Sequence, residues 1–241
     1  SSKTNNETLE NIGLENRKNS LFERLYNYCE MNSLEFAYDK LTYQGRMHQE
    51  IALFPNHSFY NSELKQAFEI PNLNETAKSE LSRQVKPLEL KSPTKGNLTD
   101  LLSKKRVIYF PSKIDEKNHF GKSNDLEADL VVKIVDELKK LYLFNNKGFD
   151  NKKTIGIIAP FRNQIARIKQ KLEEAQIPNF EEITVDTVER YQGSQRDIII
   201  FSFAINNPFQ LNGIVNLNDD GTVDRKLNVA LTRAKEQLIL I

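Results

Sequence analysis

The chain has little of the chemistry that stabilises secreted or zinc-binding proteins. Among its 241 residues it has one cysteine, Cys29, no tryptophan, and three histidines, His48, His57 and His119. One thiol cannot form an internal disulfide, and these histidines and the cysteine do not have the spacing of a zinc site. We therefore expect an intracellular protein in a reducing compartment, cytoplasmic by default, with no metal site of its own.

An excess of one charge and long apolar runs are also missing. The 34 basic residues offset 33 acidic ones, which leaves a net charge of +1. This balance neither predicts nor excludes a polyanion partner, because local patches can oppose the average. No apolar run is long enough to cross a bilayer, and residues 1–19 lack the apolar stretch of a secretory signal. We expect no membrane partner and a polar, disordered lead over residues 1–19.

Strand and helix patterns alternate through the second half of the chain. Helical spacing of apolar residues covers 126–142, 161–172 and 225–235. Strand-like runs are "RVIYF" (106–110), "TIGIIAP" (154–160), "EITVDT" (182–187), "RDIIIFSFA" (196–204) and "QLILI" (237–241). This order predicts an α/β fold with a doubly wound, mostly parallel sheet flanked by helices. Such folds bind ligands at the carboxyl ends of their strands.

The first half is less regular. An amphipathic helix begins at Ser20, and one domain is expected from there to residue 241. Residues 61–105 contain Pro71, Pro87 and Pro93 among many lysines, asparagines and serines, so we expect an irregular insertion with one short helix. The last predicted strand stops at residue 241, where such a strand would normally continue, so we expect a longer parent protein.

The stretch "HFGKSND" (119–125) has the Gly-Lys-Ser sequence that ends a phosphate-binding loop. Such a loop needs a glycine five residues before its Gly-Lys pair, and Glu116 occupies that position. A carboxylate there would repel phosphate. We therefore predict a solvated loop that ends in a helix cap at Ser123 or Asn124, with Glu127 in the first turn. A dinucleotide enzyme is also excluded, because no strand precedes a Gly-x-Gly-x-x-Gly sequence.

Several segments resemble the second motor domain of superfamily 1 helicases of the up-frameshift type, which are ATP-driven DNA and RNA translocases. They are "YQGRMHQEIALFPNHSFYNSEL" (43–64), "IIAPFRNQIARI" (157–168), "TVDTVERYQGSQRDIIIFS" (184–202) and "RKLNVALTRAKEQLILI" (225–241). They follow the family's order from about residue 20 to the end. The resemblance implies a RecA-like domain of the P-loop NTPase class without its own phosphate loop. It also implies that the first motor domain, which mainly holds ATP and Mg²⁺, precedes residue 1 and is a partner in the same polypeptide.

The resemblance gives Arg46 and Arg233 the role of arginine fingers. ATP hydrolysis builds negative charge on the γ-phosphate oxygens, and a guanidinium stabilises it with two parallel donors. From the residues alone, Arg233 is equally a surface cation near the end of the last helix. The resemblance also places Gln44, Gly193, Gln195 and Arg225 at the nucleotide. Gly45 replaces a tyrosine that stacks near the adenine in the family, and whether Tyr43 substitutes for it stays open.

The other motifs imply part of a track for single-stranded DNA or RNA. Polar residues near the ends of strands are its candidates, and these are Thr184, Thr187, Arg162, Asn163 and Gln164. Phe161 shares the helical stripe of Ile165 and Ile168, so a core role is preferred to base stacking. His48 is expected to pack and form local hydrogen bonds.

The preferred function is therefore the C-terminal motor domain of an ATP-dependent helicase, inactive by itself. The alternative is a non-catalytic module that retains the fold and binds nucleic acid or protein. A phosphate loop encoded upstream in the same gene would favour the first of the two.

Overall fold

The structure is a computed structural model that describes residues 20–191, 193–217 and 224–241. The predicted lead over residues 1–19 lies outside the described residues. The chain divides into two compact units, residues 1–42 and residues 43–241. In the first unit, the predicted helix is present as α2 (Leu21–Met31), and the Ser20 side chain caps it by accepting a hydrogen bond from Glu23 N at 3.1 Å. The 3-10 helix η1 (Glu35–Ala37) follows.

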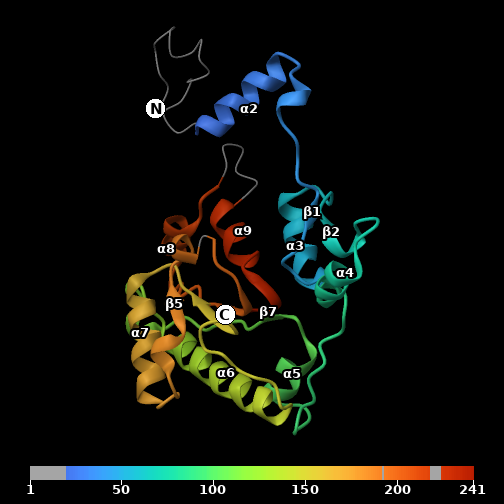
Figure 1. The fold of residues 1–241 in the computed structure, drawn as a ribbon. Coiled ribbons are helices and arrows are strands. Elements are labelled where there is room, and N and C mark those ends of the chain that lie inside the picture. The colour runs from blue at the N-terminus through green and yellow to red at the C-terminus, as the bar shows by residue number, and fades with distance from the viewer. Residues whose placement is uncertain (1–19, 192, 218–223) are drawn as a thin grey trace. The chain divides into compact units, whose positions relative to one another are not determined.

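The second unit is built on a five-stranded sheet. Its strands lie in the order β3 (Val107–Tyr109), β7 (Ala234–Leu240), β6 (Arg196–Phe201), β4 (Ile155–Ile158) and β5 (Thr184–Asp186). Every neighbouring pair is parallel, and Ile157 on the inner strand β4 pairs with Val185 on one side and Ile200 on the other. The predicted α/β fold, consistent with a RecA-like domain, is confirmed (Figure 1).

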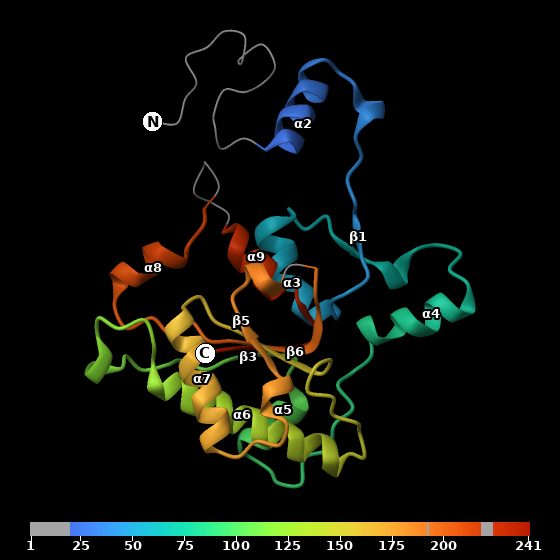
Figure 2. The same ribbon diagram turned by 60° about the vertical axis from the view of Figure 1, so that its left-hand side comes forward.

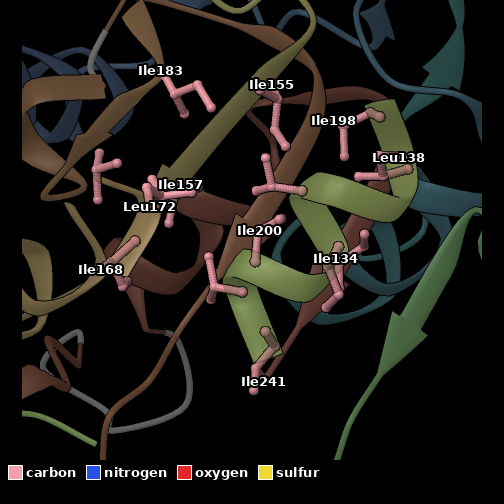
Figure 3. Close-up of a cluster of buried hydrophobic side chains, with 14 of the residues drawn as sticks. Ile134, Leu138, Ile155, Ile157, Ile168, Leu172, Ile183, Ile198, Ile200 and Ile241 are labelled. Carbon is pink, nitrogen blue, oxygen red and sulfur yellow. The ribbon is translucent and has the colours of Figure 1, made fainter. Parts of the chain in front are cut away.

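Helices cover both faces of this sheet. Apolar residues of α5 (Leu98–Lys104), α6 (Asp125–Phe144) and α7 (Arg162–Glu174) pack with the strands in one core. Residues of α3 (Gln49–Phe59) and α9 (Arg225–Leu231) pack in a second core on the opposite face. Figure 2 shows these layers, and in Figure 3 Ile134 and Leu138 of α6 lie against Ile198 and Ile200. Burial on both faces explains the uninterrupted apolar run of β6.

The segment 61–105 is more regular than its composition suggests. It contains β2 (Lys65–Gln66), which pairs with β1 (Tyr43–Gln44), and two helices, α4 (Glu75–Leu81) and α5. The expectation of one short helix was therefore wrong. Asn74 accepts a hydrogen bond from Ala77 N, and Asn97 accepts one from Asp100 N. Asparagines that indicated irregular chain are instead helix caps.

The stretch "GKSND" begins a helix, as predicted. Asn124 caps α6 by accepting a hydrogen bond from Glu127 N at 3.0 Å. A β-carbon on Gly121 would lie 1.8 Å from Asn118 Oδ1, so this glycine makes room for a side chain of its own loop. Its presence in the sequence thus has a structural cause other than phosphate binding.

Candidate functional site

The turn between β1 and α3 presents Arg46. The Gln44 side chain closes this turn, because its Oε1 accepts hydrogen bonds from Arg46 N at 3.0 Å and Met47 N at 2.7 Å, while its Nε2 donates to Met47 O at 2.8 Å. Arg46 Nε then donates to Gln195 Oε1 at 3.0 Å, and its Nη1 donates to Thr232 O at 3.0 Å. Two sequence-distant loops therefore hold the guanidinium.

Arg233 lies in the turn between α9 and β7. The predicted helix over 225–235 ends earlier, at Leu231, because the capping residue Thr232 bonds back to Asn228 O and a strand starts at Ala234. The residue is therefore not part of the last helix, which corrects the expectation. Its side chain is only 8% exposed, with Nε donating to Val229 O at 3.1 Å and Nη1 to Ser194 O at 3.4 Å.

The two guanidiniums are neighbours without an acidic partner. Among the described residues, no carboxylate forms an ion pair with Arg46 or Arg233, and both arginines donate only to carbonyl and amide oxygens. Burial lowers the pKa of Arg233, and the nearby charge of Arg46 lowers it further. Two adjacent cations in a partly desolvated place create a potential that an anion with several oxygens would satisfy.

The two arginines lie where the strands of the sheet begin. The fold class predicted a ligand site where the strands end. Arg196 N donates to Arg233 O at 3.1 Å, and Arg196 pairs with Ala234 at the beginning of β6 and β7. Arg233 is thus at the amino ends of these strands, whereas the general rule for α/β folds indicates the carboxyl ends. The difference arises because Arg233 directly precedes β7, and Arg46 binds the same turn through Thr232 O.

The predicted nucleotide-contacting residues divide into two groups. Gln44 and Gln195 contact Arg46 directly, and Gly193 lies two residues before Gln195 with φ at +79°, a conformation that favours glycine. Arg225 is exposed at the first residue of α9, and its side chain forms no hydrogen bond with Arg46 or Arg233, both of which the structure describes. The structure therefore does not bring Arg225 to the arginine pair.

The position of Gly45 has space for a larger residue. A β-carbon there would meet Ala67 Cβ and Leu81 Cδ2 at 3.8 Å, which are ordinary contacts. Tyr43, which directly precedes Gln44 in β1, is 38% exposed. Whether Tyr43 takes the place of the family's adenine-stacking tyrosine stays open.

Three predicted nucleic-acid residues meet at the carboxyl edge of the sheet. Arg162 and Asn163 begin α7 after β4, both exposed, and Thr187 follows β5. Arg162 and Thr187 line one cavity with Lys169 and Arg190, which the sequence analysis did not select. The sequence pattern did not indicate these two cations as nucleic-acid contacts. Lys169 lies in a later turn of α7, and Arg190 lies in the 3-10 helix η6 (Glu189–Tyr191), so neither directly follows a strand.

Two other candidates have internal roles. Gln164 is fully buried, with Nε2 donating to Ser202 Oγ at 2.9 Å and Oε1 accepting from Asn124 N at 2.8 Å. Thr184 lies at the amino end of β5, where its Oγ1 accepts from Arg196 Nη2 at 3.1 Å. Their polar atoms serve the fold, so we leave both out of the proposed track.

His48 and Phe161 have the local roles predicted for them. His48 caps α3, with Nδ1 accepting from Glu50 N at 3.2 Å and Nε2 in contact with Lys86 O at 3.0 Å. Its pKa is lowered by burial and by Arg106, which favours the neutral ring. Phe161 is buried to 9% exposure before α7 and packs in the fold.

Arg83 is a site residue that the sequence analysis missed. Its Nη1 donates to Arg46 O at 2.6 Å and its Nη2 to Gly45 O at 2.7 Å, so one guanidinium binds both carbonyls of the Arg46 turn. It also lies 3.6 Å from Glu236 Oε1. No motif indicated it, because it belongs to the segment predicted to be irregular.

The described residues contain no group of three or more histidine, cysteine or acidic side chains placed to hold a metal ion. In the same part of the chain, no helix combines the length and apolar character needed to span a bilayer. The arginine pair fits a polyphosphate by charge.

The fold is an α/β domain consistent with a RecA-like fold, with two neighbouring guanidiniums at the amino ends of β6 and β7. The family model described as "AAA domain" (AAA_12) matches residues 17–241, and the chain belongs to this family of superfamily 1 helicases of the up-frameshift type.

Curated relatives agree with this assignment. The chain is 32% identical over 202 residues to helicase sen1 of Schizosaccharomyces pombe, covering 83% of this chain and 10% of the relative. It is 32% identical over 231 residues to an uncharacterized ATP-dependent helicase of Methanocaldococcus jannaschii, covering 94% and 29%. It is 30% identical over 233 residues to the DNA replication ATP-dependent helicase/nuclease DNA2 of Xenopus laevis, covering 94% and 20%. The chain thus spans less than a third of each of these relatives.

Proposed function

We propose that this chain is the second motor domain of an ATP-dependent helicase and that it supplies Arg46 and Arg233 to ATP held by a first motor domain. The observation that carries the proposal is the pair of adjacent guanidiniums with no carboxylate partner among the described residues. Most charged side chains in proteins that are as buried as that of Arg233 have a counter-charge. A triphosphate brought by another domain would provide one.

The chemistry required of this half is charge stabilisation. Phosphoryl transfer spreads negative charge over the γ-phosphate oxygens, and catalysis depends mainly on positioning and electrostatics. Closure of the two domains would place Arg46 and Arg233 at those oxygens and exclude water. ATP and its Mg²⁺ would be held mainly by the first domain, because this chain has no phosphate loop.

Single-stranded DNA or RNA would bind at the other edge of the sheet. Arg162, Asn163 and Thr187 are exposed or half-buried there, with Lys169 and Arg190 beside them. Such a cluster binds phosphates and sugars with little sequence preference.

The test is Arg233→Ala in a protein that joins this chain to its first motor domain. Hydrolysis of ATP should fall by about 10³-fold or more, as for loss of an arginine finger, while ATP binding stays within a fewfold of the wild-type protein. Steady-state hydrolysis and binding of a fluorescent ATP analogue measure the two quantities.

The matched control is Arg167→Ala. Arg167 pairs with Asp125 between α7 and α6, so its loss removes an arginine and an ion pair without changing the arginine pair. It should leave hydrolysis nearly unchanged. Wild-type turnover in the Arg233→Ala protein would exclude Arg233 from catalysis and favour the non-catalytic binding module.

A further inference from the structure

Two exposed phenylalanines lie in segments that follow the carboxyl ends of the strands. Phe120, in the loop between β3 and α6, is 88% exposed, and Phe209, in α8 (Pro208–Ile214) after β6, is 84% exposed. Because all five strands are parallel, both residues lie at the same edge as Arg162 and Thr187. Exposed apolar side chains that lie together on a protein surface can mark an interaction site.

The loop that carries Phe120 is held in a defined conformation against α8. Asn207 Nδ2 donates to His119 O at 2.7 Å, and Gln210 Nε2 donates to Gly121 O at 2.7 Å, one bond on each side of Phe120. The fully buried Asn206 donates to Ser123 O at 2.7 Å. These bonds tie the two phenylalanine-bearing segments together at the carboxyl ends of the strands.

The same loop reaches the predicted nucleic-acid residues. Lys122 Nζ lies 5.7 Å from the centre of the Phe161 ring, which directly precedes Arg162. The order of the strands in the sheet sets the order of the segments that follow them. Phe120 comes after β3, Phe209 after β6, Arg162 after β4 and Thr187 after β5. Exposed rings and cations therefore follow one another along a single edge.

The charges of this edge favour a polyanion. Five cations form no ion pair with any of the described residues: Lys113, Lys117, Lys122, Arg162 and Lys169. The nearby acids are mostly engaged, since Asp125 binds Arg167, which lowers the pKa of Asp125, and Asp115 accepts hydrogen bonds from two backbone N–H groups. Glu116 remains as an exposed carboxylate.

We propose that Phe120 and Phe209 form a stacking platform for the bases of single-stranded nucleic acid, whose phosphates bind the cations of the same edge. This proposal rests on the proposed function and extends the strand's path from Thr187 and Arg162 across α8 to the loop before α6. Stacking of bases on aromatic rings is tolerant of sequence, because every base has a π-face. The platform thus binds any sequence of DNA or RNA.

The absence of tryptophan from the 241-residue chain makes a direct test possible. Phe120→Trp keeps a stacking ring and introduces a single fluorescent indole. Titration with oligothymidylate or oligouridylate should quench this indole, because a base stacked on it deactivates its excited state. Phe144→Trp is the matched control: Phe144 is 54% exposed but ends α6, away from the carboxyl edge, and should show no quenching.

A second measurement separates stacking from a structural effect. Phe120→Ala should weaken binding of an ordinary single strand by about tenfold, and should leave unchanged the binding of an abasic strand, which has the same phosphates and no bases. Arg162→Ala should weaken binding of both strands, and more salt should reduce this part of the affinity. Fluorescence anisotropy of end-labelled strands measures each constant.

The outcomes distinguish the two proposals. If strands bind and Arg162→Ala weakens them, but the indole at position 120 is not quenched or Phe120→Ala weakens both strands equally, the platform is refuted and the proposed track stands. If the chain binds neither strand at low salt, the nucleic-acid part of the proposed function fails, and the platform fails with it.

Discussion

At the scale of single residues, the arginine pair depends on side chains that position it. Gln44 closes the Arg46 turn, and Arg83 binds the carbonyls of Gly45 and Arg46. The resemblance identified Arg46 and Arg233 because they belong to short motifs. It could not identify Arg83, since a bond between residues 37 positions apart depends on how α4 packs, and no local pattern encodes that contact.

Arg83 should therefore affect turnover without contacting ATP. In a protein with both motor domains, Arg83→Ala should lower kcat for ATP hydrolysis on the order of tenfold or more, because small displacements of catalytic groups are costly. The KM for ATP should change little, since in the proposed function the first domain would hold the nucleotide. Arg83→Lys should be intermediate, as an ammonium cannot bind both carbonyls in the same fork geometry. A larger KM with unchanged kcat would contradict a positioning role.

At the scale of elements, a buried polar cluster joins α6, α7 and the end of β6. Glu127 is 1% exposed, and its Oε2 accepts hydrogen bonds from Ser202 Oγ at 2.7 Å and Ala204 N at 2.8 Å. Gln164 also donates to Ser202 Oγ. Polar residues in the first turn of a helix usually face solvent, so the sequence provided no reason to expect that Glu127 and Gln164 are buried. Their burial depends on the loop after β6, which folds over them.

The carboxyl group of Glu127 should make stability depend on pH. Burial raises the pKa of Glu127, against the effect of its hydrogen bonds. The folded state therefore holds the proton more firmly than the unfolded chain, and the contribution of Glu127 to stability is present at low pH and is lost as pH rises through the raised pKa. Glu127→Gln has no such proton, so its free energy of unfolding should rise relative to wild type over this range.

Urea unfolding of both proteins from pH 4 to pH 8 would measure this difference in the free energy of unfolding. The contributions of the other titrating groups are nearly the same in both proteins and largely cancel. A difference that does not vary with pH would show that the Glu127 carboxyl group has the same pKa in the folded and unfolded chains.

At the scale of the whole domain, the two candidate sites lie on opposite edges of one sheet. The arginine pair is at the amino ends of β6 and β7, and the cations near Arg162 and Thr187 are at the carboxyl ends of β4 and β5. A strand of six residues such as β6 spans roughly 20 Å. Two apolar cores, one on each face of the sheet, pack the strands between these two ends.

The fold class and the order of elements were predictable because apolar periodicity depends only on local sequence. The place of Arg233 before a strand also follows from that order, because the strand 237–241 is predicted after it, but the general rule for α/β folds indicated the other ends of the strands. The domain boundaries, with one domain from residue 20, stay a prediction. The division at residue 43 places α2 in a separate unit.

The last prediction concerns what this domain can do alone. In the proposed function the arginine pair would stabilise charge on a phosphate that the chain itself has no loop to hold, so the 241-residue chain mixed with ATP and Mg²⁺ should show hydrolysis no faster than buffer. A coupled phosphate-release assay with and without oligothymidylate measures it, and a protein joining both motor domains provides the active reference. Robust turnover by the chain alone, unchanged in Arg46→Ala and Arg233→Ala, would require a complete nucleotide site that does not use these arginines. It would refute their role as residues supplied to another domain.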